Sequence, residues 1–199
     1  MPLSHIDEAK RQLAEKMRPL RREAHRRAGR AAAENLWQQF EDARRQGLII
    51  DSDDVVSGYW PIRDELDTRR LLTGLTDQGI RCALPVVDGR DKPLLFRRWQ
   101  PGLELVQRSF GLSEPPEAAQ VLTPRVLLVP LLAVDSRGNR LGYGGGNYDR
   151  TLSFLRQSVP IVAVGIAFEA QRVADVPYDR RDAALDWVVT ENSTYRCAG

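Results

Sequence analysis

The chain has 199 residues, of which 42% are apolar, and its formal net charge at neutral pH is +2. This length can bury one substantial core, so we expect a single domain over residues 1–199. The near balance of charge gives no overall argument for a nucleic-acid partner, and the lack of any repeat of about 20–50 residues argues against solenoids and propellers.

Cysteine content and hydropathy indicate the compartment. Cys82 and Cys197 lie far apart in the sequence, and neither is surrounded by the spacing of a disulfide framework or a zinc site. Residues 1–30 lack the apolar core of a signal peptide, and no run approaches the roughly 20 apolar residues of a membrane helix. We therefore expect a cytoplasmic protein without a membrane partner.

The N-terminal segment, residues 1–46, is expected to be helical because Ala, Arg, Glu and Gln dominate it. Ser4 resembles a helix cap, and Pro19 should break or kink the segment, so two helical pieces are expected. Four apolar side chains at helical spacing should pack this basic segment on the rest of the domain. They are Ala32, Leu36, Trp37 and Phe40.

The next stretch predicts a strand–helix–strand unit. Residues 55–60 form an apolar run ended by Pro61, and residues 68–78 have a helical pattern that stops at Gly79. Residues 81–87 are again apolar. This succession is typical of two parallel strands joined by a crossover helix.

Further strands are predicted at residues 94–99 and 126–129, separated by a long polar loop that reaches Thr123. The run at 126–129 is continuously apolar and β-branched in part, which is the pattern of a central strand buried on both faces. Pro130 should end it, because proline cannot donate to a strand ladder.

The last third predicts a turn at 135–139, a helix near 148–157, and strands at 161–167 and 187–190. Strands that alternate with helices imply a doubly wound α/β domain, with a mainly parallel sheet flanked by helices.

The richest chemical signal is the glycine-rich stretch N-R-L-G-Y-G-G-G-N-Y-D-R at 139–150. A loop of this kind, between a buried strand and a helix, directs several backbone N–H groups and the positive end of the helix dipole at one point, which suits phosphate. Arg140 and Arg150 are candidate counter-charges, and Asp149 offers a hard oxygen for Mg²⁺. Alternatively, the glycines form a simple connecting turn, with Asp149 and Arg150 as an ordinary capping pair.

These residues resemble the signature of the 5-formyltetrahydrofolate cyclo-ligases, R-L-G-Y-G-G-G-x-Y-D-R after an apolar strand with L-V-P-L. The resemblance extends over nearly the whole chain. It includes K-x-x-L in the first helix, D-E-L-D-T at 64–68, A-L-P-V at 83–86 and L-x-F-R-x-W-x-P-G at 94–102.

The resemblance implies three groups of site residues. ATP would be bound by Lys10, Arg140, Leu141, Gly142, Tyr143, Gly144, Gly145, Gly146, Asn147 and Tyr148. The folate would be bound by Trp60, Glu65, Tyr143, Gly144, Gly145, Gly146 and Asn147. Mg²⁺ would be held by Asp149 and Asp186, and Arg140 and Asp149 would serve catalysis.

Two positions depart from the family pattern. Ala14 replaces an arginine that commonly closes the lysine motif, which leaves Arg11 or Arg18 as substitutes. Asn147 stands where the family often has an aromatic residue, so Tyr143 or Trp60 would supply the aromatic wall.

The resemblance implies an ATP- and Mg²⁺-dependent conversion of 5-formyltetrahydrofolate to 5,10-methenyltetrahydrofolate, with release of ADP and phosphate. The partners would be the reduced folate and ATP, and the protein would be a monomer or weak homodimer. One alternative is a folate- or nucleotide-binding relative without turnover. Another is a nucleic-acid-binding module, since residues 10–30 hold nine Lys or Arg against two Glu. No aromatic residues are interleaved there to stack on bases, so this alternative is the weaker one.

Overall fold

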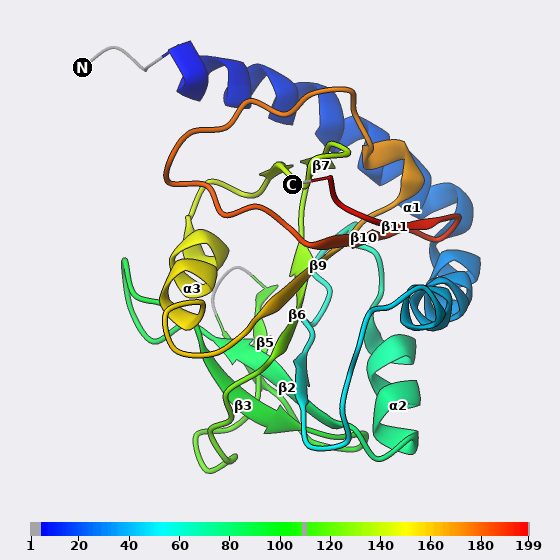
Figure 1. The fold of residues 1–199 in the computed structure, drawn as a ribbon, viewed down its shortest axis with the longest axis vertical. Coiled ribbons are helices and arrows are strands. Elements are labelled where there is room, and N and C mark those ends of the chain that lie inside the picture. The colour runs from blue at the N-terminus through cyan, green and yellow to red at the C-terminus, as the bar shows by residue number, and fades with distance from the viewer. Residues whose placement is uncertain (1–4, 109–110, 199) are drawn as a thin grey trace.

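A seven-stranded sheet forms the centre of the protein, whose computed structural model describes residues 5–108 and 111–198. The strand order across the sheet is β11-β10-β9-β6-β1-β2-β3 (Figure 1). In that order the strands are Thr194–Arg196, Trp187–Val189, Val162–Ile166, Val126–Pro130, Val55–Ser57, Arg81–Val86 and Leu95–Trp99.

The five inner strands, from β10 to β2, are parallel, and the edge strands β11 and β3 are antiparallel to their neighbours. This arrangement confirms the expected mainly parallel α/β sheet. The sequence analysis predicted no strand after 187–190, but β11 follows it and folds back on β10 at the sheet edge. The first strand is shorter than expected, since regular pairing ends at Ser57 and the chain turns away toward Pro61.

Helices cover both faces of the sheet. Alternate residues of the strands enter two separate apolar clusters. Val56 and Leu128 pack in the cluster that includes residues of α1 (His5–Arg45) and α2 (Arg69–Asp77), whereas Leu127 and Ala163 pack in the cluster with Leu152 of α3. Figure 1 shows α2 and α3 (Asn147–Leu155) on opposite sides of the sheet. Strand β6 is therefore buried on both faces, as predicted.

Helix α1 is one continuous element of 41 residues with Pro19 inside it, so the expected division into two helical pieces is wrong. A proline removes one backbone hydrogen bond in a helix interior. The turns on either side of it are anchored, because Met17 and Arg21 are both buried against the rest of the protein. Ser4, the expected cap, lies outside the described residues. Of the predicted stripe, Ala32, Leu36 and Phe40 are buried and Trp37 partly so.

Two small two-stranded sheets lie outside the central sheet. The polar stretch before Thr123 contains β4 (Val106–Gln107) paired with β5 (Ser113–Glu114), which the sequence did not predict. The predicted turn at 135–139 joins β7 (Ala133–Val134) to β8 (Arg140–Leu141). The buried carboxylate of Asp135 stabilises that turn by accepting hydrogen bonds from the backbone N–H groups of Arg137 and Asn139. A short 3₁₀ helix, Glu169–Gln171, follows β9.

Within the part of the chain that is described, no helix combines the length and apolar character that crossing a membrane would require.

Gly58 allows helix α2 to pack closely on the end of β1. A methyl group added at this position would lie 2.6 Å from a terminal carbon of Leu72, a fully buried side chain, so atoms on one side of this contact would have to shift. We expect Gly58→Ala to lower the free energy of unfolding by about 1–3 kcal/mol, measured by urea denaturation. Gly29→Ala is the matched control, because its methyl group would make only ordinary contacts 3.6 Å from His25 inside helix α1, so it should stabilise by about 0.5–1 kcal/mol. Equal effects of the two substitutions would contradict the packing argument.

Candidate active site

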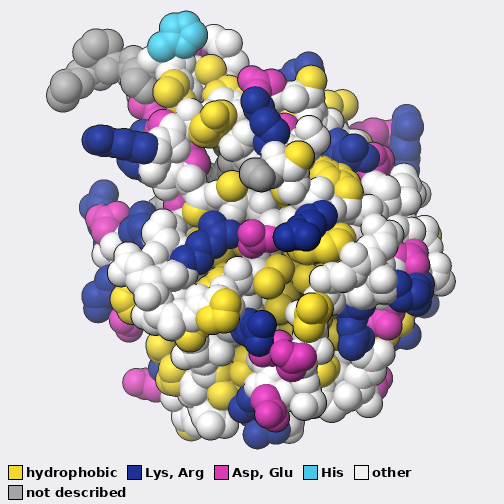
Figure 2. All heavy atoms as spheres, in the orientation of Figure 1, with side chains coloured by type: hydrophobic (Ala, Val, Ile, Leu, Met, Phe, Trp, Pro, Cys, Tyr) yellow, Lys and Arg dark blue, Asp and Glu magenta, His cyan; other side chains and the backbone are white. Residues whose placement is uncertain are grey.

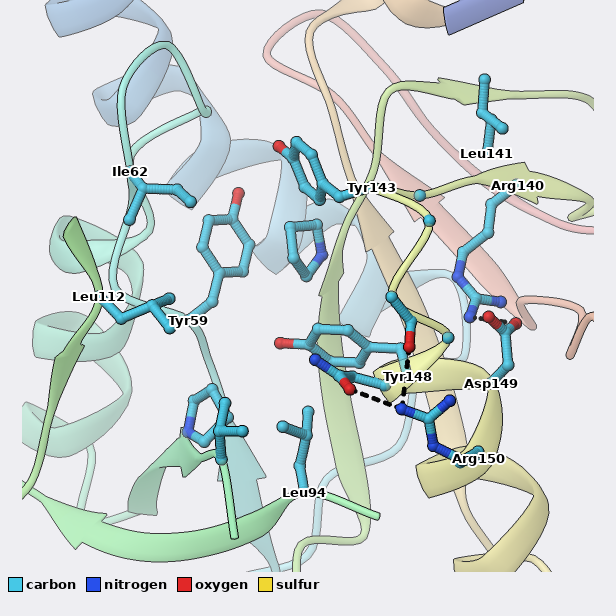
Figure 3. A pocket seen from close by; sticks show the side chains of 18 of the residues that line it. Tyr59, Ile62, Leu94, Leu112, Arg140, Leu141, Tyr143, Tyr148, Asp149 and Arg150 are labelled. Atoms are coloured by element: carbon cyan, nitrogen blue, oxygen red, sulfur yellow. Dashed lines mark hydrogen bonds and ion pairs between the residues drawn. The ribbon is translucent and has the colours of Figure 1, made fainter. Parts of the chain in front are cut away.

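A cavity of about 800 Å³ opens at the carboxyl ends of the parallel strands. Tyr59 and Trp60 follow β1, Val87 follows β2, and Pro130 ends β6, and all four line the cavity. The same edge is where open α/β sheets commonly bind ligands, because the loops after successive strands meet there. Figure 3 shows Tyr59 and Ile62 on one side of this space and Arg140 with Asp149 on the other.

The glycine loop, residues 142–146, forms one wall of the cavity between β8 and α3. Gly144 and Gly146 have φ values of 90° and 64°, so the backbone itself requires glycine at these two positions. Gly142 is different, because its φ is not left-handed and a methyl group added there would meet no atom within 4 Å. The glycine at 142 is therefore not required by the fold, and its absent side chain leaves space inside the cavity.

The glycine loop leads directly into the first turn of α3. The helix is capped by Gly146 without any side-chain hydrogen bond. Its first N–H groups therefore have no side-chain acceptor, and together with the helix dipole they create a site suited to an anion.

Arg140 and Asp149 form a largely buried ion pair beside the loop. Arg140 Nη2 donates to Asp149 Oδ1 over 2.7 Å, and the Arg140 side chain is only 4% exposed. Burial lowers the pKa of the Arg140 guanidinium, and the negative charge of Asp149 opposes that shift. Asp149 Oδ1 also accepts the backbone N–H of Ala183, whereas Oδ2 accepts no hydrogen bond from the described residues. One carboxylate oxygen thus stays available at the cavity wall.

Lys10 reaches the same end of the cavity from helix α1. Its ammonium donates to Asp182 Oδ2 over 2.6 Å and lies 3.8 Å from Asp179. Asp182 and Arg181 also line the cavity. We call Lys10, Arg140, Asp149, Arg181 and Asp182 the phosphate corner. A bound phosphate would compete with Asp182 for the ammonium of Lys10.

The suggested replacements for the missing arginine at position 14 do not lie in the cavity. Ala14 is buried in an apolar cluster with Met17. Arg11 is on the solvent side of the helix, where it pairs with Glu8 and Glu15 over 2.6 Å each, and Arg18 is exposed. Neither arginine is among the described residues that line the cavity, so the structure gives no support to Arg11 or Arg18 as the substitute. The additional arginine that lines the cavity is Arg181.

Glu65 lies at the other end of the cavity and is 95% buried, since only 5% of its surface is exposed. Its Oε1 accepts the hydroxyl proton of Tyr143 over 2.6 Å, and its Oε2 accepts the backbone N–H of Ile62 over 2.8 Å. Burial raises the pKa of Glu65, although these hydrogen bonds act in the opposite direction. Each carboxylate oxygen keeps a further acceptor position, because a carboxylate has about four lone-pair sites.

Aromatic side chains line the middle of the cavity. Tyr59, Tyr143 and Tyr148 gather there in Figure 3, and Trp60 packs against Trp99 with ring centroids 6.1 Å apart. Asn147 lines the cavity as well, but its side-chain oxygen accepts a hydrogen bond from Arg150. Tyr143 and Trp60 are thus both available as the aromatic wall expected in place of an aromatic residue at position 147.

Asp186 is the one predicted site residue that the structure does not bring to the cavity. Its Oδ2 accepts the backbone N–H of Ala163 over 2.7 Å and pairs with Arg156 over 2.9 Å. Arg156 follows the carboxyl end of α3, whereas Asp149 lies in the first turn of that helix. The two aspartates therefore sit at opposite ends of α3. Among the described residues there is also no cluster of three His, Cys, Asp or Glu that could hold a metal alone.

Several residues in or beside the cavity were not singled out from the sequence, among them Tyr59, Arg181 and Asp182 in its lining and Arg21, which contacts Tyr143. Tyr59 looked like an ordinary strand residue, and Asp182 and Arg181 lie in a loop without any periodic pattern. Arg21 gave the only usable signal, because it follows Lys10 and Met17 at helical spacing on one face of α1. A buried arginine on that face points toward an interior partner rather than toward solvent.

Comparisons with known proteins agree with this geometry. The model of the 5-formyltetrahydrofolate cyclo-ligase family matches residues 6–191. A cyclo-ligase of Haemophilus influenzae is 37% identical over 132 residues, which are 64% of this chain and 70% of that protein. The cyclo-ligase of Mycolicibacterium smegmatis is 37% identical over 152 residues, which are 72% of this chain and 76% of that protein. The solved 5,10-methenyltetrahydrofolate synthetase of Aquifex aeolicus superimposes with a TM-score of 0.71 at 26% identity, over 98% of this chain and 93% of its own.

Proposed function

This chain belongs to the 5-formyltetrahydrofolate cyclo-ligase family, and we propose that its cavity converts 5-formyltetrahydrofolate to 5,10-methenyltetrahydrofolate with consumption of ATP. The observation that carries this proposal is that one cavity has two chemically different ends. One end holds the phosphate corner and the N-terminus of α3, which has no side-chain cap. The other end holds the buried carboxylate of Glu65, and aromatic side chains lie between the two. A nucleotide and a pterin need these two kinds of site.

The reaction needs an activated formyl group, because the nitrogen lone pair of a formamide makes its carbon a poor electrophile. Transfer of the γ-phosphoryl group of ATP to the formyl oxygen releases ADP and turns that oxygen into a leaving group. Nitrogen 10 then attacks the formyl carbon and loses its proton. The bond between this carbon and the phosphorylated oxygen breaks, phosphate leaves with the bonding electrons, and the methenyl bridge remains. No bond to a protein atom is needed, so positioning and charge neutralisation are the tasks of the side chains.

The residues of the phosphate corner would share the work on the triphosphate. Backbone N–H groups of the glycine loop and of the first turn of α3 would bind phosphate oxygens, and Arg140 and Lys10 would offset their negative charge. Arg140 is held in place by Asp149 and by the carbonyl oxygen of Ala183, so little reorganisation is needed when charge develops.

Asp149 is the residue that fits a bound Mg²⁺. Its Oδ2 is a hard oxygen at the cavity wall, and Mg²⁺ commonly uses one or two carboxylates together with substrate phosphates and water. Once bound, the ion would neutralise charge on the phosphate oxygens. The contacts of Asp186 with Ala163 and Arg156 give it a structural role at the far end of α3, so we do not propose it as a ligand.

Glu65 would bind the pterin through two donors, the amino group and the adjacent ring N–H. Glu65→Gln replaces one acceptor oxygen by an NH₂ donor with little change in shape. We expect the KM for 5-formyltetrahydrofolate to rise roughly 10- to 100-fold, since hydrogen bonds to charged groups contribute about 1.5–3 kcal/mol, while the KM for ATP stays within about twofold. Initial-rate kinetics with each substrate varied would measure this. An unchanged folate KM would rule out the assignment of Glu65.

The test of the whole proposal is a spectrophotometric assay of purified protein with 5-formyltetrahydrofolate, ATP and Mg²⁺, following the near-ultraviolet band of the methenyl product. We expect product only when ATP and a divalent cation are both present. Folate binding by equilibrium dialysis with no product under any condition would instead identify a relative that binds without turnover.

The nucleic-acid alternative finds less support. Glu8 and Glu15 pair with Arg11, and Glu23 pairs with Arg26 and Arg27, so part of the charge of α1 is neutralised within the helix. On the face of the molecule that Figure 2 draws, basic and acidic side chains are intermixed rather than gathered in one basic patch.

We further propose that the protein acts in the cytoplasm as a monomer or weak homodimer. Both cysteines are free thiols, as a reducing compartment allows. Among the described residues, the large exposed apolar side chains are Leu20, Ile49, Val87, Val106, Val121, Tyr143, Phe154 and Tyr178; three lie in α1, β4 and α3, and the others lie in separate connecting segments. Light scattering at several protein concentrations would measure the mass.

A further inference from the structure

Arg21 is a buried charge that the proposed reaction does not use directly. It lies in helix α1 with 4% of its surface exposed. Its Nε and Nη2 each donate to one oxygen of Asp64 over 3.0 Å, and its Nη1 donates to the hydroxyl oxygen of Tyr143. Its carbon Cζ also lies 5.2 Å from the centre of the Tyr143 ring. One arginine thus contacts both the segment before Glu65 and the glycine loop.

The direction of each hydrogen bond in this network follows from Arg21. A guanidinium can only donate, so the hydroxyl oxygen of Tyr143 must accept from it. The single proton of that hydroxyl is then free to go to Glu65 Oε1, 2.6 Å away. Glu65 Oε2 already accepts from the backbone of Ile62. Both oxygens of Glu65 therefore act as acceptors, which is the role of an ionised carboxylate.

The same contacts fix where Tyr143 lies. Its side chain is 46% exposed, and it belongs to a loop of glycines that offers little restraint of its own. Its hydroxyl is nevertheless held by two side chains from distant parts of the chain, Arg21 of α1 and Glu65 of the turn before α2. Arg21 is in turn fixed by the two-fold contact with Asp64. Because such fork-like contacts restrict orientation, the loop is tied to the Glu65 end of the cavity.

We propose that Arg21 is a positioning residue for the folate end of the site, which acts through Tyr143 to keep Glu65 an oriented acceptor. This inference rests on the proposed function of the cavity and adds a residue that contacts neither substrate. Loss of the Arg21 guanidinium frees the Tyr143 hydroxyl to turn away from Glu65, so the buried carboxylate loses one of its hydrogen-bond donors. Because Tyr143 contacts Glu65 directly, the effect on the folate should be much larger than the effect on ATP, which is bound by the backbone of the same loop.

The experiment compares Arg21→Lys, Tyr143→Phe, the double variant and Arg11→Lys. Lysine keeps a positive charge but cannot contact Asp64 and Tyr143 in the same forked geometry. Phenylalanine removes only the hydroxyl and keeps the ring. Arg11 is the matched control, because it lies in the same helix and forms carboxylate pairs only at the exposed surface. Steady-state kinetics with each substrate varied, equilibrium dialysis with 5-formyltetrahydrofolate, and urea denaturation are measured for all variants.

We expect Arg21→Lys and Tyr143→Phe each to raise the KM and Kd for 5-formyltetrahydrofolate roughly tenfold, with the KM for ATP within about twofold. In the double variant, the folate KM and Kd should exceed those of the more strongly affected single variant by no more than about twofold, since both substitutions act through one hydroxyl. The hydrogen bond from Tyr143 lowers the pKa of Glu65, so its loss should move the acid limb of kcat/KM for the folate to higher pH in Arg21→Lys and in Tyr143→Phe. Arg11→Lys should resemble the wild type.

Several results would overturn the inference. These are fully additive effects in the double variant, an equal rise in the KM for ATP, or a folate Kd unchanged in folded Tyr143→Phe protein. If Arg21→Lys does not fold, Tyr143→Phe still decides the outcome, because its hydroxyl is the link. Failure of the proposed function would be recognised separately, as wild-type protein that binds folate or ATP but forms no methenyl product.

Discussion

Replacing Asp149 by Asn should lower kcat at saturating ATP and Mg²⁺ by about 100-fold or more, with the fold retained. Asn keeps an oxygen that can accept the hydrogen bonds of Arg140 and the Ala183 amide, but it removes the negative charge that would hold a divalent cation. Losing one preorganised electrostatic group in an active site commonly costs 10²–10³ in rate. Methenyl formation over a range of Mg²⁺ concentrations measures the effect, and excess Mg²⁺ should recover part of it.

Asp186→Asn is the matched control for this prediction. Both residues are aspartates whose carboxylates accept a backbone N–H and pair with an arginine beside α3, but only Asp149 lines the cavity. Asp186→Asn should therefore leave the dependence of the rate on Mg²⁺ unchanged. A similar loss in both variants would return Asp186 to the candidate ligands and would contradict the separation of the two ends of α3.

Asp149→Ala is expected to be a poorer test than Asp149→Asn. It removes the acceptor as well as the charge, and it leaves the buried guanidinium of Arg140 without its carboxylate partner. Breaking a buried pair by removal of one partner costs about 3 kcal/mol or more, and this would confound a kinetic measurement with partial unfolding.

Gly142→Ala should reduce kcat/KM for ATP by about 100-fold and at the same time leave the protein equally or slightly more stable. The added methyl group meets no atom within 4 Å and the backbone does not require glycine, so the fold has no reason to resist it. Replacing such a glycine commonly stabilises a protein by about 0.4–1 kcal/mol. In the cavity, however, the methyl group occupies space where the loop backbone would approach a phosphate, and a displacement of about 1 Å can cost 100-fold.

Gly47→Ala is the control, with stability and activity expected to change in the opposite way from Gly142→Ala. Gly47 follows helix α1 with a φ of 112°, far from the cavity, and alanine is strained there although no atom crowds it. This variant should lose stability and keep its kcat/KM for ATP. Full activity in Gly142→Ala would mean that the loop backbone does not approach the triphosphate closely, and the glycine at 142 would then be a feature of the connection alone.

Much of the sheet could be predicted because its strands are short apolar runs bounded by proline and glycine. Strand β6 is the clearest case, since burial on both faces gives an unbroken apolar sequence before Pro130. Strand β11 was missed because it pairs along only one side and its residues are half exposed, so no apolar run marks it. The continuity of α1 through Pro19 depends on tertiary contacts of Met17 and Arg21, which helix propensity does not describe.

The glycine loop, with Arg140 and Asp149 beside it, could be singled out because these residues are close together in the sequence and form a recognisable motif. The ion pair between Arg140 and Asp149 was not predicted. The network around Arg21 could not be predicted, because Arg21 meets Tyr143 across 122 positions and Asp64 across 43. The position of Asp186 relative to the cavity could not be predicted for a related reason. A match between sequences identifies the position of an aspartate along the chain, but it does not show which end of α3 that aspartate lies near.

The ion pair between Lys10 and Asp182 joins residues 172 positions apart. During synthesis on the ribosome, the phosphate corner therefore cannot close until position 182 has emerged, even though Lys10 and most of helix α1 have been available since the beginning. Ala14 and Met17, on the side of α1 that faces the core, gain their packing partners Leu132, Ala133, Leu141 and Val176 only late in that interval. We expect the charge of the arginines along α1 to help keep the unfinished chain soluble until this helix can pack against the last strands, β10 and β11.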